Sequence, residues 1–404
     1  MRRSLVPLFA LLAALNGPAR ALTPGEPLRI GLVCPFSGGS QDFGNAARLG
    51  AELAVREINE VGGYLGTPLE LVARDDKANP DEGRKIAEEL VLQKKVAFTI
   101  GYCNTGVAMK SLDVYQDHKH LLLVPVATGT AITAKYPAAG STIFRLSVRD
   151  ELQVPFLVDD IVRRRGLNRV AVFADKTGYG EGGLKDVLKA LAEKQLEPVY
   201  VARFDLGVTS LVPQMQEAKA AGANAIISYT VGPEQAVAAK SRAEARVAAP
   251  LYGPWTMSFR TVYERAGDAT EGVLMPQTII QDIAHERRTS FQLRLRKLAG
   301  PGSPIGSLMA AAQSYDAVHL MLWAVFQTKG DTSGPALKHA LEHLERPYTG
   351  VVTTYDRPFS ATDHDAATRN MLWLGTWRGG EIRFAYPEDS KRAATIQRKA
   401  TASP

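Results

Sequence analysis

The sequence predicts an α/β protein made of two doubly wound lobes, each with a parallel sheet at its centre. Short apolar runs rich in strand-forming residues alternate with amphipathic helical segments along the 404 residues. The alternation restarts near residue 169 on a similar plan, which indicates two units side by side. The length agrees, because chains of this size usually divide into more than one compact unit.

The first unit is expected to contain four strands joined by helices. Parallel strands need a crossover connection between them, and a helix usually supplies it. The strands are expected at 28–33, 69–73, 96–100 and 121–126, with helices at 47–58, 80–92 and 107–118.

The second unit repeats this plan. Its strands are expected at 169–174, 199–204, 225–229 and 250–253, with one helix ending at 192 and others at 210–221 and 233–243. Helices at 313–328 and 335–344 are assigned to the first lobe, whereas 351–355 and 371–376 are expected to close the second sheet. We therefore predict lobe 1 at 28–147 plus 276–346, lobe 2 at 148–275 plus 347–392, and a polar tail at 393–404.

Residues 1–21 have the pattern of a secretory signal peptide. Met1-Arg2-Arg3 is basic, an apolar run follows from Leu5 to Leu15, and Ala19-Arg20-Ala21 fits a cleavage site. The apolar run is too short to span a bilayer, so export with cleavage near Ala21 is expected. Removing the three arginines of this segment lowers the formal charge from +6 to +3, which does not favour a nucleic-acid partner.

The loops that follow the strands carry the residues of a candidate pocket. In open parallel sheets, ligands bind beyond the carboxyl ends of the strands, where helix N-termini favour anions. Thr105 and Thr128 are hydroxyls in two such loops, and each could equally cap its helix. Phe43, Tyr179 and Trp255 add aromatic surface, with Tyr179 in a glycine-flanked loop that is free to swing. This pattern favours a small anion with an apolar body.

Other chemistries have weaker support. Loop 38–44 lacks the spacing of a dinucleotide fingerprint, and no P-loop or G-x-S-x-G elbow is present. His339-Ala-Leu-Glu-His343 matches an inverted zinc motif, but its histidines and Glu342 are expected on a solvated helix face. Asp175 ends a strand and could be a general base, yet nothing pairs it with a nucleophile. No cofactor and no metal are expected.

Three longer segments are informative together: Ile30-Gly-Leu-Val-Cys-Pro-Phe-Ser-Gly38, Val124-Pro-Val-Ala-Thr128 and Asp175-Lys-Thr-Gly-Tyr-Gly-Glu-Gly182. With shorter matches at 50–59, 62–63, 75–76, 271–272 and 314–317, they make the chain resemble the periplasmic solute-binding proteins of branched-chain amino acid ABC transporters. The resemblance implies a type I periplasmic-binding fold, with two α/β lobes, three crossovers and a hinge that closes over the ligand. It also implies a non-catalytic periplasmic monomer that delivers solute to a permease and ATPase complex at the inner membrane.

The resemblance extends to single residues. Thr105 occupies the place of a hydroxyl that binds the ligand carboxylate, and Phe43 and Tyr179 match aromatic ligand contacts. The implied ligand-binding set is Phe43, Thr105, Val126, Ala127, Thr128, Tyr179, Tyr229 and Trp255.

Trp255 marks a departure from the family pattern. Amino-acid-binding members carry a glutamate after Gly-Pro that pairs with the ligand ammonium, but this chain reads Gly253-Pro254-Trp255. A buried ammonium without a carboxylate partner is penalised, so the hypothesis is an aromatic acid or a branched oxo acid. A cation–π contact to Trp255 keeps hydrophobic amino acids open as ligands.

The chain has two cysteines, Cys34 and Cys103. In the expected strand order the first and third strands are neighbours, so the two thiols could form a disulfide at the cleft rim. The family's usual cysteine pair is placed differently. Two alternative functions also stay open: a ligand-sensing receptor module of the same fold, and a hydrolase that uses Asp175 or the H-x-x-E-H helix.

Overall fold

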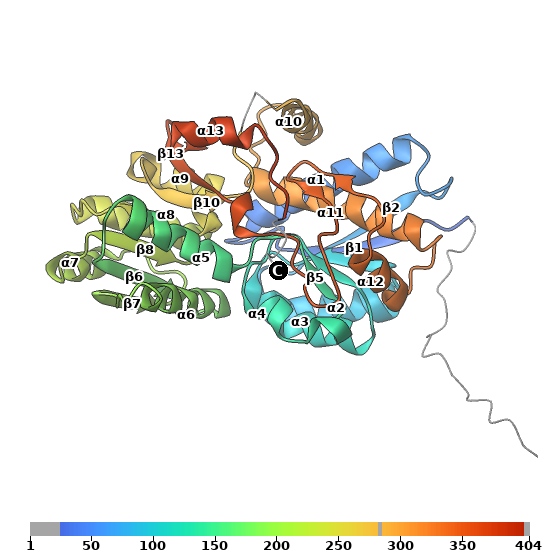
Figure 1. The fold of residues 1–404 in the computed structure, drawn as a ribbon, viewed down its shortest axis with the longest axis horizontal. Coiled ribbons are helices and arrows are strands. Elements are labelled where there is room, and N and C mark those ends of the chain that lie inside the picture. The colour runs from blue at the N-terminus through green and yellow to red at the C-terminus, as the bar shows by residue number, and fades with distance from the viewer. Residues whose placement is uncertain (1–24, 282–284, 400–404) are drawn as a thin grey trace, which may run out of the picture.

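The computed structural model describes residues 25–281 and 285–399 and contains two α/β lobes that lie side by side (Figure 1). The first lobe is built on a five-stranded parallel sheet in the order β2-β1-β3-β4-β5. Its strands are β1 (Leu28–Cys34), β2 (Leu69–Asp75), β3 (Phe98–Gly101), β4 (Leu122–Val124) and β5 (Ile143–Arg145). This order places the carboxyl ends of β1, β3 and β4 next to one another.

The second lobe is built on a seven-stranded sheet in the order β14-β13-β10-β9-β8-β6-β7. Five strands are parallel, and β13 and β14 are antiparallel additions at one edge. The strands are β6 (Val170–Asp175), β7 (Tyr200–Phe204), β8 (Ala225–Tyr229), β9 (Leu251–Tyr252), β10 (Leu274–Gln277), β13 (Trp373–Arg378) and β14 (Glu381–Phe384). The α/β prediction with two lobes is therefore confirmed.

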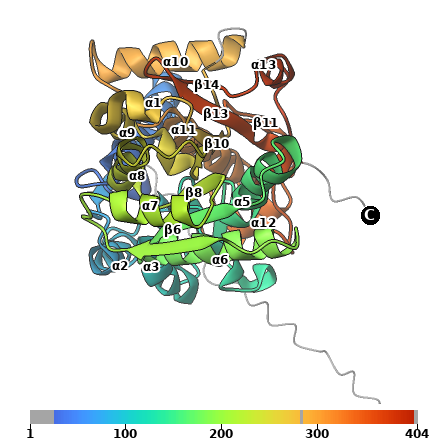
Figure 2. The same cartoon turned by 90° about the vertical axis from the view of Figure 1, so that its left-hand side faces the viewer.

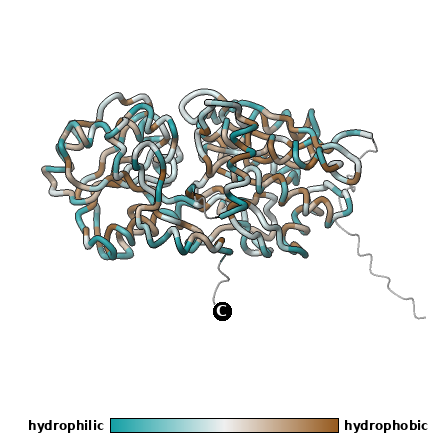
Figure 3. Tube along the Cα trace, turned by 90° about the horizontal axis from the view of Figure 1, so that it is seen from above, coloured by the Kyte–Doolittle hydropathy of each residue, from teal (hydrophilic) through white to brown (hydrophobic). Residues whose placement is uncertain are grey.

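Helices cover both faces of each sheet, as the view from the end shows for the second lobe (Figure 2). The first lobe has α1 (Gln41–Glu60), α2 (Pro80–Glu88), α3 (Thr105–Asp117), α4 (Ala131–Ala134), α10 (Glu286–Ala299), α11 (Leu308–Gln327) and α12 (Gly334–Glu342). The second has α5 (Asp150–Asp159), α6 (Gly178–Ala192), α7 (Val212–Ala220), α8 (Gly232–Glu244), α9 (Arg260–Ala266) and α13 (Pro387–Ala393). Hydrophobic residues concentrate inside each of the two bodies (Figure 3).

The chain passes between the lobes after β5, after β10 and again between α12 and β13. In the third passage, the expectation that 351–355 forms a strand of the second sheet is wrong. Instead β12 (Thr354–Tyr355) pairs with β11 (Tyr348–Thr349) in a separate two-stranded sheet. Asp316 of α11 explains this placement, because its carboxylate accepts hydrogen bonds from the backbone N–H groups of Val351 and Val352 at 2.7 and 2.9 Å.

The end of the chain packs onto the third passage as far as it is described. Lys399 donates hydrogen bonds to the carboxylate of Asp363 and to the backbone carbonyls of Pro358 and Asp365. Residues 397–399 of the expected polar tail therefore lie against the protein. The expected signal peptide lies outside the described residues. Among the residues from 25 to 281 and from 285 to 399, no helix is long and apolar enough to cross a membrane.

Candidate functional site

A small cavity of about 20 Å³ lies between the two lobes at the carboxyl ends of their strands. The first lobe contributes Ser40, Phe43, Cys103, Asn104, Thr105 and Thr128, and the second contributes Tyr179, Val231, Trp255, Thr256 and Phe259. None of these lining side chains is charged. The lobes are in contact around the cavity, since a methyl carbon placed on Gly178 of α6 would lie 3.7 Å from the Cα of Gly106 in α3.

The first-lobe wall is formed by loops that hydrogen bonds hold against each other. The Thr105 hydroxyl accepts a hydrogen bond from the backbone N–H of Gly129 at 3.1 Å. Because a hydroxyl has one proton to donate, this contact leaves the Thr105 proton available for an acceptor in the cavity. Asn104 donates to the Ser40 hydroxyl at 2.9 Å and makes no side-chain cap on α3, so the first N–H groups of that helix stay uncapped by it.

A disulfide joins Cys34, the last residue of β1, to Cys103 in the loop before α3. The two Cα atoms are 5.3 Å apart, within the normal span of a disulfide. The register of the sheet explains the proximity, because β1 and β3 are paired neighbours and Val33 lies opposite Gly101. The bond therefore ties together two of the loops that form the cavity wall.

The second-lobe wall is mainly aromatic. Trp255 is 1% exposed and meets Phe43 of the other lobe edge-to-face at 6.0 Å between ring centroids. Phe259 contacts the same Phe43 ring at 4.1 Å. Beneath them, the Gln235 amide donates to the carbonyls of Ser228 and Thr230 at 3.1 Å, which fixes the loop after β8.

Tyr179 is held firmly, so the expectation of a freely swinging loop is wrong. It lies in the first turn of α6 and is 7% exposed. Thr177 caps this helix by accepting from the backbone N–H groups of Tyr179 and Gly180, and Asp175 accepts in turn from Thr177. The Tyr179 ring packs against Tyr229 at 5.1 Å.

Buried polar groups gather behind the cavity around Asp150, the first residue of α5. Burial raises the pKa of Asp150 to about 7, although the nearby hydroxyls of Tyr229 and Thr128 favour its ionised form. No hydrogen bond of ordinary geometry within the described chain satisfies Asp150 Oδ1 or the hydroxyls of Thr128, Tyr179 and Tyr229. Buried polar groups in native proteins nearly always have partners, and in this cluster Asp150 interacts with the hydroxyls of Thr128 and Tyr229.

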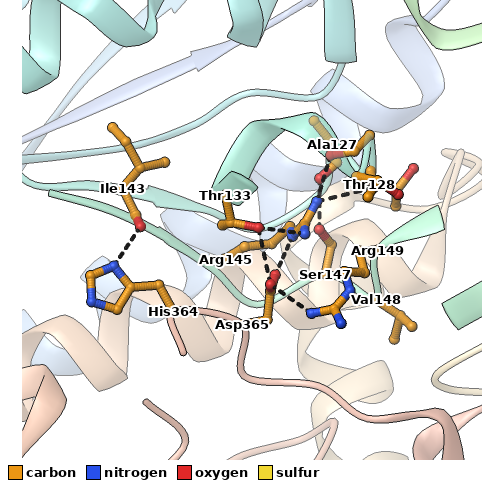
Figure 4. A network of polar contacts seen from close by, with 12 residues as sticks. Ala127, Thr128, Thr133, Ile143, Arg145, Ser147, Val148, Arg149, His364 and Asp365 are labelled. Carbon is orange, nitrogen blue, oxygen red and sulfur yellow. Dashed lines mark hydrogen bonds and ion pairs between the residues drawn. The ribbon is translucent and has the colours of Figure 1, made fainter. Parts of the chain in front are cut away.

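The Thr128 loop is anchored by Arg145, which is completely buried (Figure 4). Its guanidinium donates to the carbonyls of Thr128 and Gly129 at 3.0 and 2.8 Å and pairs with Asp365 at 2.5 Å. Backbone hydrogen bonds also link Arg145 to His364 and Ala366. The loop that carries Thr128 is thus linked through Arg145 to the third passage between the lobes.

The alternative catalytic residues have structural partners. The Asp175 carboxylate accepts from the Thr230 hydroxyl at 2.7 Å and from the Thr177 backbone at 2.8 Å. The expectation that Glu342 points outward is wrong, because its side chain is 6% exposed and its carboxylate contacts Lys338 and His364. Within residues 25–281 and 285–399, no three His, Cys, Asp or Glu side chains gather as a metal site requires.

Five residues of the expected ligand-binding set line the cavity: Phe43, Thr105, Thr128, Tyr179 and Trp255. Val126 and Ala127 are buried beside it, and Tyr229 lies behind Tyr179. Ser40, Thr256, Phe259 and Asp150 were missed by sequence reasoning. The positions of Ser40, Thr256 and Phe259 after β1 and β9 could have suggested them. Asp150 lies in the first passage, and its local sequence looks like that of any aspartate at the start of a helix.

A family model described as periplasmic binding protein matches residues 27–381. The chain belongs to the periplasmic binding protein family. A relative from Pseudomonas aeruginosa, a leucine-, isoleucine-, valine-, threonine- and alanine-binding protein, is 28% identical over 277 residues, covering 68% of this chain and 73% of the relative.

Solved structures agree in fold. A type 1 periplasmic binding protein from Bordetella pertussis superimposes with a TM-score of 0.79 at 21% identity, covering 89% of this chain and 99% of that one. A solute-binding protein from R. palustris in complex with 4-hydroxybenzoate superimposes with a TM-score of 0.75 at 21% identity, covering 88% of this chain and 95% of that one.

Membership of the periplasmic binding protein family implies an exported protein that binds a small solute.

Proposed function

We propose that this periplasmic binding protein captures a small carboxylate without an ammonium group, such as an aromatic acid or a branched oxo acid, and delivers it to a permease as a monomer. The observation that carries the proposal is the composition of the cavity wall, which combines hydroxyls with four aromatic rings and has no charged side chain. Such a wall suits a ligand with one anionic end and an apolar body.

The anionic end is expected at the first-lobe wall. The Thr105 proton and the uncapped N–H groups of α3 are donors at this wall. Hydrogen bonds from neutral donors and a helix N-terminus stabilise a carboxylate without a cationic partner. The apolar body would then meet Phe43, Trp255 and Phe259.

The absence of an acid from the lining argues against an amino acid, because its ammonium would be buried unpaired. Asp150 supports the alternative of a hydrophobic amino acid, since its carboxyl lies just behind the wall. Family relatives illustrate both classes, with amino acids in the name of the P. aeruginosa protein and 4-hydroxybenzoate in the R. palustris complex. Replacing Asp150 should therefore distinguish the two ligand classes, because only an amino acid would depend on this carboxyl group.

Capture is proposed to occur by hinge closure around the solute. A cavity of about 20 Å³ has room for about one water molecule, so an organic solute can enter only when the lobes part. Contacts to both lobes would then favour the closed form, since a ligand shifts an equilibrium only by its differential affinity for the two states.

Calorimetric titration of the stripped, exported protein tests the proposal with benzoate, 4-hydroxybenzoate, 4-methyl-2-oxopentanoate, leucine and phenylalanine. We expect at least one of the three acids to bind more tightly than both amino acids. Thr105→Val should lower the affinity for that acid by about tenfold to a hundredfold, which corresponds to the loss of one hydrogen bond to a charged group. The exposed Thr209→Val is the matched control. Tight leucine binding, lost in Asp150→Asn, with no binding of the acids would overturn the proposal.

A further inference from the structure

Two pairs of side chains join the lobes outside the cavity. In the first pair, Asp42 of α1 accepts hydrogen bonds from the Thr261 hydroxyl and, at 2.9 Å, from the Thr261 backbone N–H of α9. In the second, Thr130 at the start of α4 donates its hydroxyl to the Asp186 carboxylate of α6 at 2.8 Å. Each pair joins a threonine to an aspartate, and the two run in opposite directions between the lobes.

The pairs flank the cavity without lining it. Asp42 is next to Phe43 in sequence, and Thr261 follows Phe259 by two residues. Thr130 follows Thr128 by two residues. None of the four paired residues belongs to the cavity wall, and all four are partly exposed at its rim. A solute in the cavity would therefore touch their neighbours in the chain and not the pairs themselves.

The pairs depend on closure. α1 and α4 pack with the five-stranded sheet, whereas α6 and α9 belong to the second lobe. A movement that separates α1 from α9 and α4 from α6 breaks both pairs, because a hydrogen bond is lost once donor and acceptor part by more than a few tenths of an ångström. The Thr130 pair is further tied to the hinge side, because its hydroxyl also accepts from the Glu151 backbone N–H at 3.0 Å.

We propose that the Asp42–Thr261 and Thr130–Asp186 pairs are affinity-determining interlobe latches, which strengthen binding of every solute by the same factor by stabilising the closed form. The inference rests on solute capture between the lobes and not on the class of solute. A ligand contact changes selectivity, whereas a latch changes only the equilibrium between open and closed forms.

The test uses Thr261→Val and Thr130→Val, singly and together, with benzoate and leucine as calorimetric probes. Each single variant should lower the affinity for any probe that binds by about fivefold to twentyfold. This is the effect of one hydrogen bond to a carboxylate at a partly exposed site. The two losses should multiply in the double variant, because the pairs share no residue. Thr130→Ser should restore binding, because it keeps the hydroxyl.

Tyr136→Phe is the matched control. It removes a hydroxyl donated to Asp113, and both residues belong to the first lobe. It should leave affinity unchanged. Small-angle X-ray scattering without solute gives a readout that needs neither probe: the double latch variant should have a larger radius of gyration than the wild type and Tyr136→Phe should not.

Double-mutant cycles with Asp42→Asn and Asp186→Asn test each pairing. Within a pair, the double variant should lose little more affinity than the more damaging single variant. Unchanged affinity together with an unchanged radius would overturn the proposal, as would a loss confined to one probe when both bind. If the acids fail and leucine binds, the proposed ligand class fails while the latches are still tested with leucine.

Discussion

Removing the disulfide between Cys34 and Cys103 should destabilise the protein substantially. The perturbation is Cys34→Ala with Cys103→Ala, which keeps both positions small and apolar. Both residues are at most 4% exposed, so the substitutions create no new surface contacts. The main expected effect is therefore on the unfolded chain, which the disulfide closes into a loop.

The magnitude follows from the loop length. The cysteines are 69 residues apart in sequence. The chain-entropy relation for a loop of this length gives about 15 cal/mol/K, or about 4.4 kcal/mol near room temperature. That is a large fraction of the roughly 5–15 kcal/mol by which folded domains are stable. The first lobe, which contains both cysteines, should lose this stability.

Urea unfolding followed by circular dichroism measures the effect, with the wild type in dithiothreitol as a second route to the open form. Both should lower the free energy of unfolding by similar amounts. A loss below about 1 kcal/mol in both would refute the reasoning from loop length. Solute affinity should fall as well, since the bond ties the Ser40 and Thr105 loops together.

Three further predictions concern buried contacts. Asp365→Ala leaves the Arg145 guanidinium buried without its carboxylate and should cost about 3–5 kcal/mol in urea unfolding, whereas Arg145→Met with Asp365→Leu should cost less than the sum of the single changes. Gly129→Ala should weaken solute binding, because a Cβ there would lie 2.2 Å from Thr105 Cγ2; Thr105→Ser removes that methyl group and should partly rescue the variant in calorimetry. Burial raises the pKa of Asp150 from 3.8 to about 7, so the folded protein binds this proton more tightly than the unfolded chain and stability should fall as pH rises from about 4 to about 7. Asp150→Asn should reduce the difference in unfolding free energy between pH 5.5 and pH 8. Part of the difference should remain, because burial also raises the pKa of Asp76 and Asp316 to about 7. An unchanged difference would contradict the raised pKa of Asp150.

The parallel core was predictable because its signals are local. β8 spans Ala225–Tyr229 as expected, and β6 begins and ends within one residue of its predicted bounds. Buried parallel strands are continuous apolar runs between helices, and such runs are visible without knowledge of their neighbours. The helix Glu286–Ala299 was not anticipated, because it has few apolar residues and most of its residues are polar or charged.

The third passage was less predictable. Val351 and Val352 have the composition of a strand, but their N–H groups bond to Asp316, which lies 35 and 36 residues away. A side chain that captures backbone donors in this way overrides strand propensity, and its position cannot be inferred from either segment alone.

The candidate site was predictable to the extent that it follows from topology. The loops of Thr105 and Thr128 follow strands of the first sheet and that of Trp255 follows a strand of the second, so parallel order brings each loop to the carboxyl edge of its own sheet. Asp150 and Arg145 depend on how the first passage threads between the lobes. The rigidity of Tyr179 depends on the cap by Thr177, and a glycine on each side had favoured the opposite conclusion.

The size of the closed cavity has a consequence for the timing of transport. If solute exchanges only while the lobes are apart, release cannot be faster than opening, whatever the strength of the ligand contacts. Molecules that close while empty must reopen before they can capture a solute. Empty closed molecules would also present a permease with much the same outer surface as loaded ones. At low solute concentration they would compete for docking, so uptake would depend on the ratio of loaded to empty closed protein.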